Sequence, residues 1–396
     1  MFSAAASGGD IGVFASLTGL RNDDVLHAHL EAEPHFPAHF LVRDSDRKLL
    51  ILVVRGTISE ADVVTDVVAG DAPFLGGQAH EAMARSANAL YASLMTAGPG
   101  NMDLAGHLQD HPGYSFALAG HSLGGGVASL LHCIMHDAVA RRAAQRERLA
   151  RLRGGKAPAA SPAPEEAVPA PAECWCFGAP PVLAPLDTVP FSAAATLTQV
   201  VVGEDSVPRL SLWSVRRLAR LLRLLDEEYP PRSVGQVLGV SRSNRPPLGV
   251  AVARAESRLE EEEFHLRHVA EAIKRQRDED SGEEAQAHGA DALSEAEAAR
   301  MGARTGGRDA TARDQVGGDQ DKVNCPAPAG EQTASRLFLP GKVVLVGSPG
   351  TPESLELREV SAEDLGDIPV SSRAILDHMP TAYVAVLRDL AVPERE

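Results

Sequence analysis

Aromatic residues and long apolar runs are both scarce in this sequence. Of its 396 residues, 44% are hydrophobic but only 4% are aromatic, so a core has to be built mainly from Val, Leu and Ala. The nearest approach to a long apolar run is 49–54, well short of the roughly 18 residues of a transmembrane helix. The first ten residues also lack the basic start and apolar stretch of a signal peptide. We therefore expect a protein that is cytoplasmic or peripheral on an intracellular membrane.

Positive charge and cysteine are in short supply as well. The 38 Lys and Arg residues face 54 Asp and Glu residues, which leaves a net charge of -16 at pH 7. Such a chain repels nucleic acid, so we expect no nucleic-acid partner, and any membrane contact has to be local. Among the four cysteines, Cys174 and Cys176 form a C-x-C pair without the second pair of a zinc site. We interpret them as buried, reduced thiols and expect no metal site.

Composition divides the chain into one α/β domain with two low-complexity insertions. Residues 154–172 are rich in Pro and Ala and predict a flexible insertion that forms neither a helix nor a packed strand. Residues 254–335 are acidic and poor in large apolar side chains, which predicts a second flexible insertion, although 255–277 could form a charged helix. The remaining division is an N-terminal segment, 1–34, and a domain over 35–396.

Apolar patterning predicts strands that alternate with helices. The near-continuous apolar run 197–202 is typical of a parallel strand that is covered on both faces. Strands are expected at 38–43, 49–55, 114–119, 174–177, 197–202 and 337–346, and helices from a capping box at Ser59 and Asp62, over 80–95, from 125 and over 381–390. This order predicts a mostly parallel sheet with flanking helices.

The most informative motif is Gly120-His121-Ser122-Leu123-Gly124, a G-x-S-x-G pattern between a predicted strand and a predicted helix. At such an elbow the serine sits on a strained turn with its hydroxyl exposed, and the flanking glycines let the two backbones pack closely. Ser122 is therefore a candidate nucleophile. The alternative is a glycine-rich turn that contains a serine by chance.

A serine nucleophile needs an acid and a base, which follow it in this chain order in hydrolases with such an elbow. Glu204 and Asp205 both follow the strand 197–202, at the sheet edge where α/β proteins gather their chemistry. We favour Asp205, because the turn after it suits a carboxylate bound to local backbone N–H groups, whereas Glu204 can face solvent.

The candidate base is His378. The chain order removes the histidines that precede Asp205, and His265, His268 and His288 lie in the acidic insertion, where nothing holds a base in place. Asp377 is a possible partner of His378, but neighbouring side chains diverge, so we expect it to cap the last helix instead. A surface histidine without a catalytic role is the alternative.

An oxyanion hole combines the N–H after the nucleophile with an N–H from a loop after an earlier strand. Leu123 supplies the first donor. Thr57, which follows Arg55 and Gly56 at a strand end, is the candidate for the second, and its hydroxyl could donate too. The alternative for Thr57 is a tight turn with a satisfied side chain.

The range Leu212 to Glu228 alternates arginines with leucines in the pattern of a basic amphipathic helix. Such a helix can lie in a lipid interface, which predicts a peripheral membrane contact. The alternative is an ordinary domain helix with its leucines in the core.

Further motifs accompany the elbow in a fixed order: Leu52 to Thr57, Ser59, Asp62, Thr65-Asp66, His80, Gly120 to Gly125, Cys176 to Pro181, and Val201 to Arg209. Together they resemble the class 3 lipases, and within these they look most like the sn-1-specific diacylglycerol lipases. The resemblance covers about residues 35–225 and returns at 337–390. It implies an α/β-hydrolase fold and a triad of Ser122, Asp205 and His378.

The resemblance also implies a function. It points to a serine lipase that hydrolyses an acyl ester of diacylglycerol or a related glycerolipid through an acyl-enzyme on Ser122, with no metal or organic cofactor. Two alternatives stay open. One is a phospholipase A1 or general carboxylesterase of the same fold, and the other is a non-catalytic, lipase-like protein that binds a partner.

Overall fold

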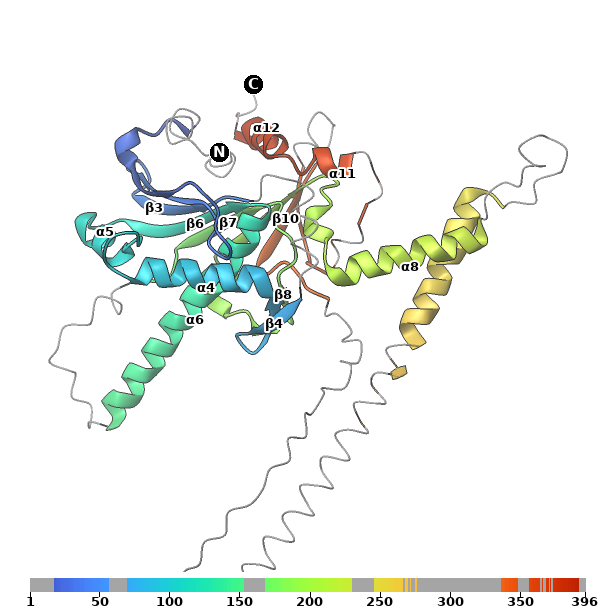
Figure 1. The fold of residues 1–396 in the computed structure, drawn as a ribbon, viewed down its shortest axis with the longest axis horizontal. Coiled ribbons are helices and arrows are strands. Elements are labelled where there is room, and N and C mark those ends of the chain that lie inside the picture. The colour runs from blue at the N-terminus through green and yellow to red at the C-terminus, as the bar shows by residue number, and fades with distance from the viewer. Residues whose placement is uncertain are drawn as a thin grey trace, which may run out of the picture. The chain divides into compact units, whose positions relative to one another are not determined.

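The computed structural model describes most of the chain (Figure 1), namely residues 18–56, 70–152, 168–229, 246–265, 268–269, 271, 275, 336–347, 356–363, 365, 368–369, 371 and 373–391. These residues belong to two compact units. The first comprises Met1–Leu218 and Thr333–Glu396, and the second comprises Ala219–Gln332.

The first unit is built on an eight-stranded sheet of order β1-β2-β3-β6-β7-β9-β10-β11. The strands are β1 (Val25–His29), β2 (His39–Asp44), β3 (Leu49–Val54), β6 (Ser115–His121), β7 (Glu173–Phe177), β9 (Leu197–Val202), β10 (Lys342–Val346) and β11 (Leu357–Val360). The strands from β3 to β10 run parallel, and antiparallel pairs close both edges. The predicted α/β-hydrolase class, a mostly parallel sheet with flanking helices, is confirmed.

Helices cover both faces of this sheet. On one face lie α6 (Leu123–Leu152) and α4 (Glu81–Met95), which pack against each other over a core that includes Leu118, Cys174 and Cys176. On the other face α12 (Pro380–Ala391) buries Tyr383 and Val386 against the ends of β9 and β10. Because neighbouring residues of a strand point to opposite faces, the apolar run of β9 serves both layers.

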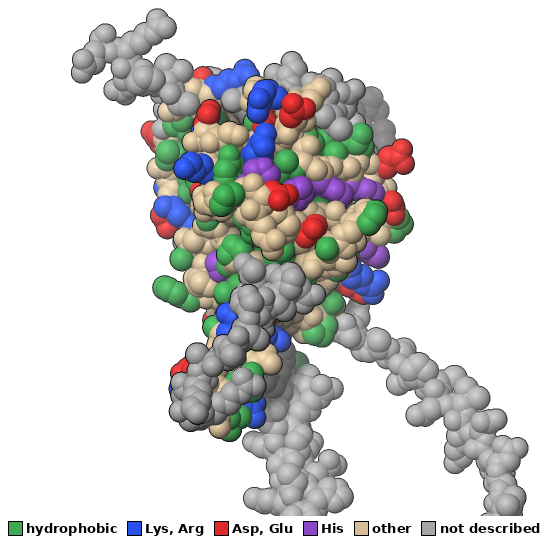
Figure 2. All heavy atoms as spheres, turned by 90° about the vertical axis from the view of Figure 1, so that its left-hand side faces the viewer, with side chains coloured by type: hydrophobic (Ala, Val, Ile, Leu, Met, Phe, Trp, Pro, Cys, Tyr) green, Lys and Arg blue, Asp and Glu red, His purple; other side chains and the backbone are tan. Residues whose placement is uncertain are grey.

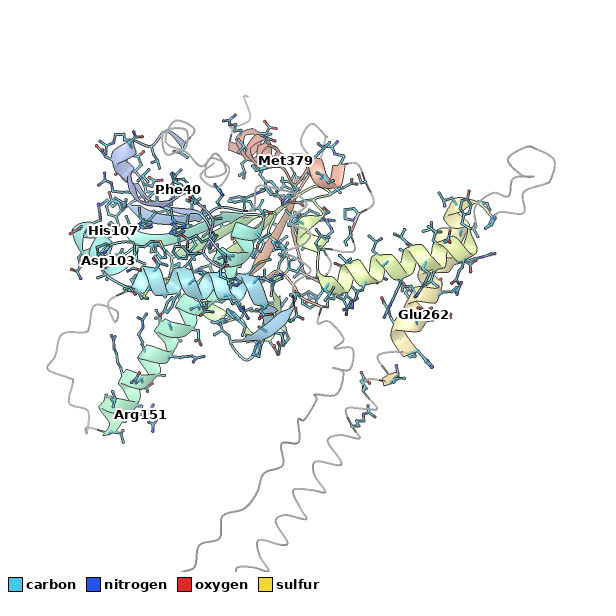
Figure 3. All side chains as sticks on the ribbon, viewed as in Figure 1. Phe40, Asp103, His107, Arg151, Glu262 and Met379 are labelled. Atoms are coloured by element: carbon cyan, nitrogen blue, oxygen red, sulfur yellow. The ribbon has the colours of Figure 1, made fainter. Side chains whose placement is uncertain are left out.

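The helix α6 is longer than the sequence suggested. It continues through the basic run 141–152, and Arg151 lies near its far end, away from the sheet (Figure 3). Among the described residues α6 alone is long and apolar enough to cross a membrane, but 67% of its apolar window is buried inside the protein. That burial is typical of the core helix of a soluble protein, so the signal for a membrane span is weak.

Smaller elements complete the first unit. A second sheet joins β4 (Asp71–Phe74), β5 (Gly77–His80) and β8 (Leu183–Ala184). The short helices are η1 (Asn22–Asp24), α5 (Leu104–Asp110), η3 (Leu186–Thr188), α7 (Phe191–Ala194), η4 (Val207–Arg209) and α11 (Arg373–Leu376). The strand β1 lies within residues 1–34, which the sequence analysis set apart from the domain. The helix expected from Ser59 and Asp62 lies outside the described residues.

The end of the predicted Pro/Ala-rich insertion belongs to the core. Val168 is buried, and the N–H of Ala172 donates to the carbonyl of Phe116 at 2.7 Å. His136 of α6 also contacts the carbonyl of Pro171 at 3.2 Å. The expectation of a flexible segment is therefore wrong for 168–172, because an extended Pro-rich segment can pack without regular structure. Residues 153–167 lie outside the described part of the chain.

In the second unit, the end of α8 (Leu212–Glu228) packs against a helix over residues 248–265. Leu224 of α8 is buried with Ala255 and Leu259. Arg258 pairs with Glu227 at 2.9 Å and with Glu228 at 3.1 Å. The predicted start of the acidic insertion, residue 254, falls inside this helix, and most of the insertion lies outside the described residues.

Histidines gather at the β1 edge of the large sheet. The ring of His39 stacks on those of His27 and His29, with ring centroids 5.4 Å apart in each pair. Figure 2, which views the molecule from the left-hand side of Figure 1, shows a row of histidine side chains across that face. His39 is fully buried, and burial lowers its pKa to about 4.

Candidate functional site

The turn between β6 and α6 has the geometry of a nucleophile elbow. Ser122 has φ of 55°, a left-handed conformation that is strained for a residue with a side chain. Its N–H donates to the carbonyl of Phe177 at 2.9 Å, which fixes the turn to β7. A Cβ at Gly120 would lie 2.3 Å from the carbonyl oxygen of Gly124, and one at Gly124 would lie 2.3 Å from that of Val54. Only glycine fits at either position.

The structure brings Ser122, His378 and Asp205 together in one hydrogen-bonded chain. Ser122 Oγ lies 3.0 Å from His378 Nε2, and His378 Nδ1 lies 3.0 Å from both carboxylate oxygens of Asp205. A carboxylate can only accept, so Nδ1 carries the proton and Nε2 is free to accept the serine hydroxyl. All three side chains are buried, and Asp205 is fully so.

Two further donors hold the buried carboxylate of Asp205. The N–H of Val207 donates to Oδ1 at 2.9 Å, which is the local backbone contact expected for the turn after Asp205. The hydroxyl of Tyr383 donates to Oδ2 at 2.6 Å. Burial and the neighbouring Asp205 charge raise the pKa of Tyr383 well above its ordinary value, so the hydroxyl keeps its proton. Sequence reasoning missed Tyr383, since a tyrosine in a helix is usually a core residue.

A glycine makes room for this arrangement. Gly178, directly after β7, has φ of 56°, and a Cβ there would lie 2.7 Å from Asp205 Oδ2, 2.9 Å from the Tyr383 hydroxyl and 3.1 Å from His378 Nδ1. The motif Cys176 to Pro181 carries this glycine, but its place beneath the acid and the base was not foreseen.

Of the two candidate acids, Asp205 contacts His378, whereas the side chain of Glu204 is exposed. Asp377, expected to cap the last helix, is buried, and its Oδ2 accepts the backbone N–H of Glu204 at 2.9 Å. The sequence analysis did not foresee this contact. The turn that bears His378 folds back onto the end of β9, so a carboxylate there reaches a backbone donor of another element.

His121, the elbow residue before Ser122, is buried beneath the base. Its Nε2 lies 2.9 Å from the backbone carbonyl oxygen of His378, and the two rings are 4.9 Å apart. Burial, and then the neighbouring His378, lowers the pKa of His121 to about 4. His121 is therefore a neutral donor near pH 7, distinct from the imidazole that contacts the serine.

Only one of the two predicted oxyanion-hole donors lies within the described residues. Leu123 is the first residue of α6, so its N–H belongs to the first turn, whose donors have no partner within the helix. Thr57 lies outside the described residues. The chain before it, at Gly56, lies against the elbow, because a Cβ there would be 2.7 Å from the His121 carbonyl oxygen and 3.1 Å from Ser122 Cβ.

Exposed apolar side chains flank His378. Ile375 and Leu376 are 54% and 64% exposed, and Met379 is 39% exposed. Figure 3 shows Met379 beside α11 and α12. The exposed surface of the turn that bears His378 is therefore largely apolar.

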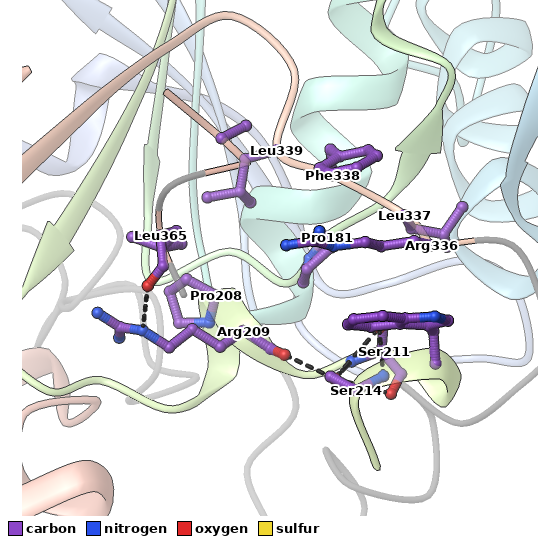
Figure 4. Close-up of a pocket in the computed structure, with 12 residues that line it drawn as sticks. Pro181, Pro208, Arg209, Ser211, Ser214, Arg336, Leu337, Phe338, Leu339 and Leu365 are labelled. Atoms are coloured by element: carbon purple, nitrogen blue, oxygen red, sulfur yellow. Dashed lines mark hydrogen bonds between the residues drawn. The ribbon is translucent and has the colours of Figure 1, made fainter. Parts of the chain in front are cut away.

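A small cavity of about 20 Å³ lies elsewhere in the first unit, between η4, the start of α8 and the isolated β-bridge at Phe338 (Figure 4). Arg209 and Arg336 line it together with Trp213 and Phe338. Arg336 stacks on Trp213, and Arg209 donates to the carbonyl of Leu365 at 2.9 Å. A space of this size holds about one water molecule and is too small for an acyl chain.

Comparison with known proteins finds a protein family whose model matches part of this chain. The model of the family "Lipase (class 3)" matches residues 51–215. Diacylglycerol lipase-beta of Mus musculus is 31% identical over 134 residues, which are 32% of this chain and 19% of that protein, so the chain spans about a fifth of the relative. A Rhizomucor miehei lipase propeptide complex is 19% identical, with 52% of this chain and 60% of that one covered and a TM-score of 0.36. Lipase II from Rhizopus niveus is 20% identical, with 53% and 70% covered and a TM-score of 0.37.

Proposed function

Because residues 51–215 of this chain belong to the class 3 lipase family, we propose that the protein is a serine lipase with Ser122 as its nucleophile. The observation that carries the proposal is the hydrogen-bonded chain from Ser122 Oγ through His378 to Asp205, which starts on a strained elbow. A serine, a base and a buried acid in this geometry are the parts needed for acyl transfer.

In the proposed reaction, Ser122 Oγ attacks the ester carbonyl carbon while His378 Nε2 takes the hydroxyl proton. Asp205 stabilises the imidazolium that forms, and the Tyr383 and Val207 donors keep its carboxylate in place. The C–O bond of the ester then breaks, the alcohol leaves with the proton from His378, and the acyl group stays on Ser122. A water molecule releases the fatty acid by the same steps, with His378 again as the base.

The negative oxygen of each tetrahedral intermediate needs donors near Ser122. The N–H of Leu123 is one, since it opens α6, where the helix dipole also favours negative charge. Thr57 remains the proposed second donor. No metal or organic cofactor is needed in this scheme.

For the substrate we propose an acyl ester of diacylglycerol or a related glycerolipid. The relative named diacylglycerol lipase-beta supports this choice. The exposed apolar side chains of Ile375, Leu376 and Met379, on the turn that bears His378, support a substrate with long acyl chains, because such side chains favour contact with lipid over water.

A peripheral membrane contact through Leu212 to Glu228 is part of the proposal. The leucines Leu221, Leu224 and Leu225 of α8 pack within the second unit. Leu222 is 53% exposed, so lipid contact would come from this leucine and from the exposed arginines of α8, which favour anionic headgroups. Co-sedimentation with phosphatidylserine vesicles should fall when Arg216, Arg220 and Arg223 are changed to Gln, and unchanged binding would remove α8 from the contact.

The experiment that tests the function is fluorophosphonate labelling combined with hydrolysis assays. Wild-type protein should be labelled at Ser122 and should release fatty acid from diacylglycerol faster than from phosphatidylcholine or a short soluble ester. Ser122→Ala should lose labelling and about a million-fold in turnover, while its circular dichroism spectrum stays unchanged. Full activity of Ser122→Ala would exclude the proposed nucleophile, and preference for phosphatidylcholine would point to a phospholipase A1.

A further inference from the structure

The turn that bears His378 is a short connection between α11 and α12, and its own hydrogen bonds are local. The N–H of His378 donates to the carbonyl of Ile375 at 3.1 Å, and that of Asp377 donates to the carbonyl of Arg373 at 2.8 Å. These bonds shape the turn but do not attach it to the strands that carry Ser122 and Asp205. The distance from His378 Nε2 to Ser122 Oγ therefore depends on contacts between this turn and the sheet.

The backbone N–H of Ser206 donates to the carbonyl of Ala374 in α11 at 3.2 Å. At the turn itself, two side chains outside the triad add cross-links. The first runs from His121, at the end of β6, to the backbone carbonyl oxygen of His378, over 2.9 Å. A carbonyl oxygen only accepts, so His121 Nε2 carries the proton. The second runs from the backbone N–H of Glu204, just after β9, to Oδ2 of Asp377, over 2.9 Å.

We propose that His121 and Asp377 are positioning residues. They hold the turn that bears His378 between the elbow at Ser122 and the loop after β9 that carries Asp205. This inference rests on the proposed function of Ser122 and His378, and it assigns neither residue a step in the chemistry. His121 ties the base to the strand that ends at the serine. Asp377 ties the adjacent residue to the loop that holds the acid.

The surroundings of His121 suit this role. It is 6% exposed, and its ring packs against those of His378 and Tyr383, with centroid distances of 4.9 Å and 5.5 Å. Burial, two ring contacts and a hydrogen bond restrict the orientation of the His121 ring, which fixes the position of the donor for the His378 carbonyl. Because His121 stays neutral near pH 7, it adds no charge beside the imidazolium that forms on His378 during the reaction.

The test compares a pair of variants at each position. His121→Phe keeps a planar ring but removes the donor, whereas His121→Gln keeps an amide N–H at similar reach. Asp377→Ala removes the acceptor for the Glu204 N–H, whereas Asp377→Asn keeps one. We expect His121→Phe and Asp377→Ala to lower kcat on a soluble nitrophenyl ester by about 100-fold, since a misplacement of about 1 Å costs that much. KM should change less than threefold. The variants His121→Gln and Asp377→Asn should keep kcat within about tenfold of wild type.

His132 provides the matched control. It is a fully buried histidine of α6 whose Nε2 contacts the carbonyl of Ala193 at 3.2 Å, away from the triad. His132→Phe should lower the thermal midpoint but leave kcat within threefold of wild type. If His132→Phe lowers kcat as much as His121→Phe does, the loss reflects general destabilisation and the positioning role is refuted.

Other outcomes also decide the inference. If His121→Phe and Asp377→Ala keep kcat within threefold, or if Gln and Asn fail to rescue it, the cross-links do not position the base. If His121→Phe does not fold, the Asp377 pair and the rescue by His121→Gln carry the test. Failure of wild-type protein to react with a fluorophosphonate at Ser122 would instead refute the proposed function itself, before any variant is compared.

Discussion

Acid should unfold the α/β unit, because three of its buried histidines stay neutral in the folded state. Burial lowers the pKa of His39 and of His121 to about 4 and that of His132 to about 3, against 6.5 for an ordinary histidine. Well above pH 6.5 these groups are neutral in both states and contribute nothing to the pH dependence. As the pH falls through 6.5, the unfolded chain binds protons that the folded chain does not. The free energy of unfolding therefore decreases as the pH decreases.

The size of the effect follows from the number of protons. Between pH 6 and 5 each histidine takes up about one proton on unfolding, which costs about 1 kcal/mol per pH unit, or about 3 to 4 kcal/mol for the three together. The total stability of a domain is typically about 5 to 15 kcal/mol. The unit should therefore lose most of its stability between pH 6.5 and about pH 4.

Urea unfolding at several pH values measures this slope. Both tryptophans of the chain, Trp175 and Trp213, lie in the first unit, so their fluorescence follows that unit. His132→Gln removes one titrating group and should reduce the slope by about 1 kcal/mol per pH unit. His265→Gln, at an exposed position, should leave the slope unchanged. A free energy of unfolding that is constant from pH 7 to 5, or a slope that is the same in His132→Gln, would refute the reasoning.

Four substitutions at or near the acid give further predictions. Asp205→Asn should lower kcat by about ten-thousand-fold because the imidazolium loses its carboxylate, while Glu204→Gln should leave kcat nearly unchanged. Assays of both variants with one ester check this ranking, and the reverse ranking would assign the role of the acid to Glu204. Gly178→Ala should destabilise the fold by more than the roughly 1 to 2 kcal/mol of its left-handed backbone, because the added Cβ also meets Asp205, so an unchanged thermal midpoint would contradict the crowding. Tyr383→Phe removes a hydrogen bond to a buried carboxylate and should cost about 2 kcal/mol in urea unfolding; a cost below the error of the measurement would show that the bond is dispensable.

The elements around the elbow could be predicted because their signals are local. The apolar run of β3, the glycines on either side of Ser122 and the turn after Asp205 each restrict the backbone within a few residues. Chain order reduced fourteen histidines to the four after Asp205, and three of these lie in the acidic insertion, which left His378. The structure brings that residue to Ser122. The catalytic roles of these residues remain predictions until activity is measured.

What could not be predicted depends on contacts between distant segments. Tyr383 reaches Asp205 only because α12 packs on the end of β9, and nothing near Tyr383 in the sequence marks that contact. Asp377 next to His378 resembled a helix cap, but its acceptor role depends on Glu204, 173 residues earlier. The strand β1 alternates Leu26 and Ala28 with two histidines over only five residues, and so short and weakly apolar a run did not predict its pairing with β2.

The separation of Ser122 from His378, 256 residues, also sets when the site can exist during synthesis. At a translation rate of about 5 to 20 residues per second, the nucleophile leaves the ribosome roughly 10 to 50 s before the base. Throughout that time the elbow strand can pair with β3, but Ser122 has no imidazole beside it. If Ser122 and His378 act as proposed, we expect a nascent chain to be inert toward lipid until its last helix docks.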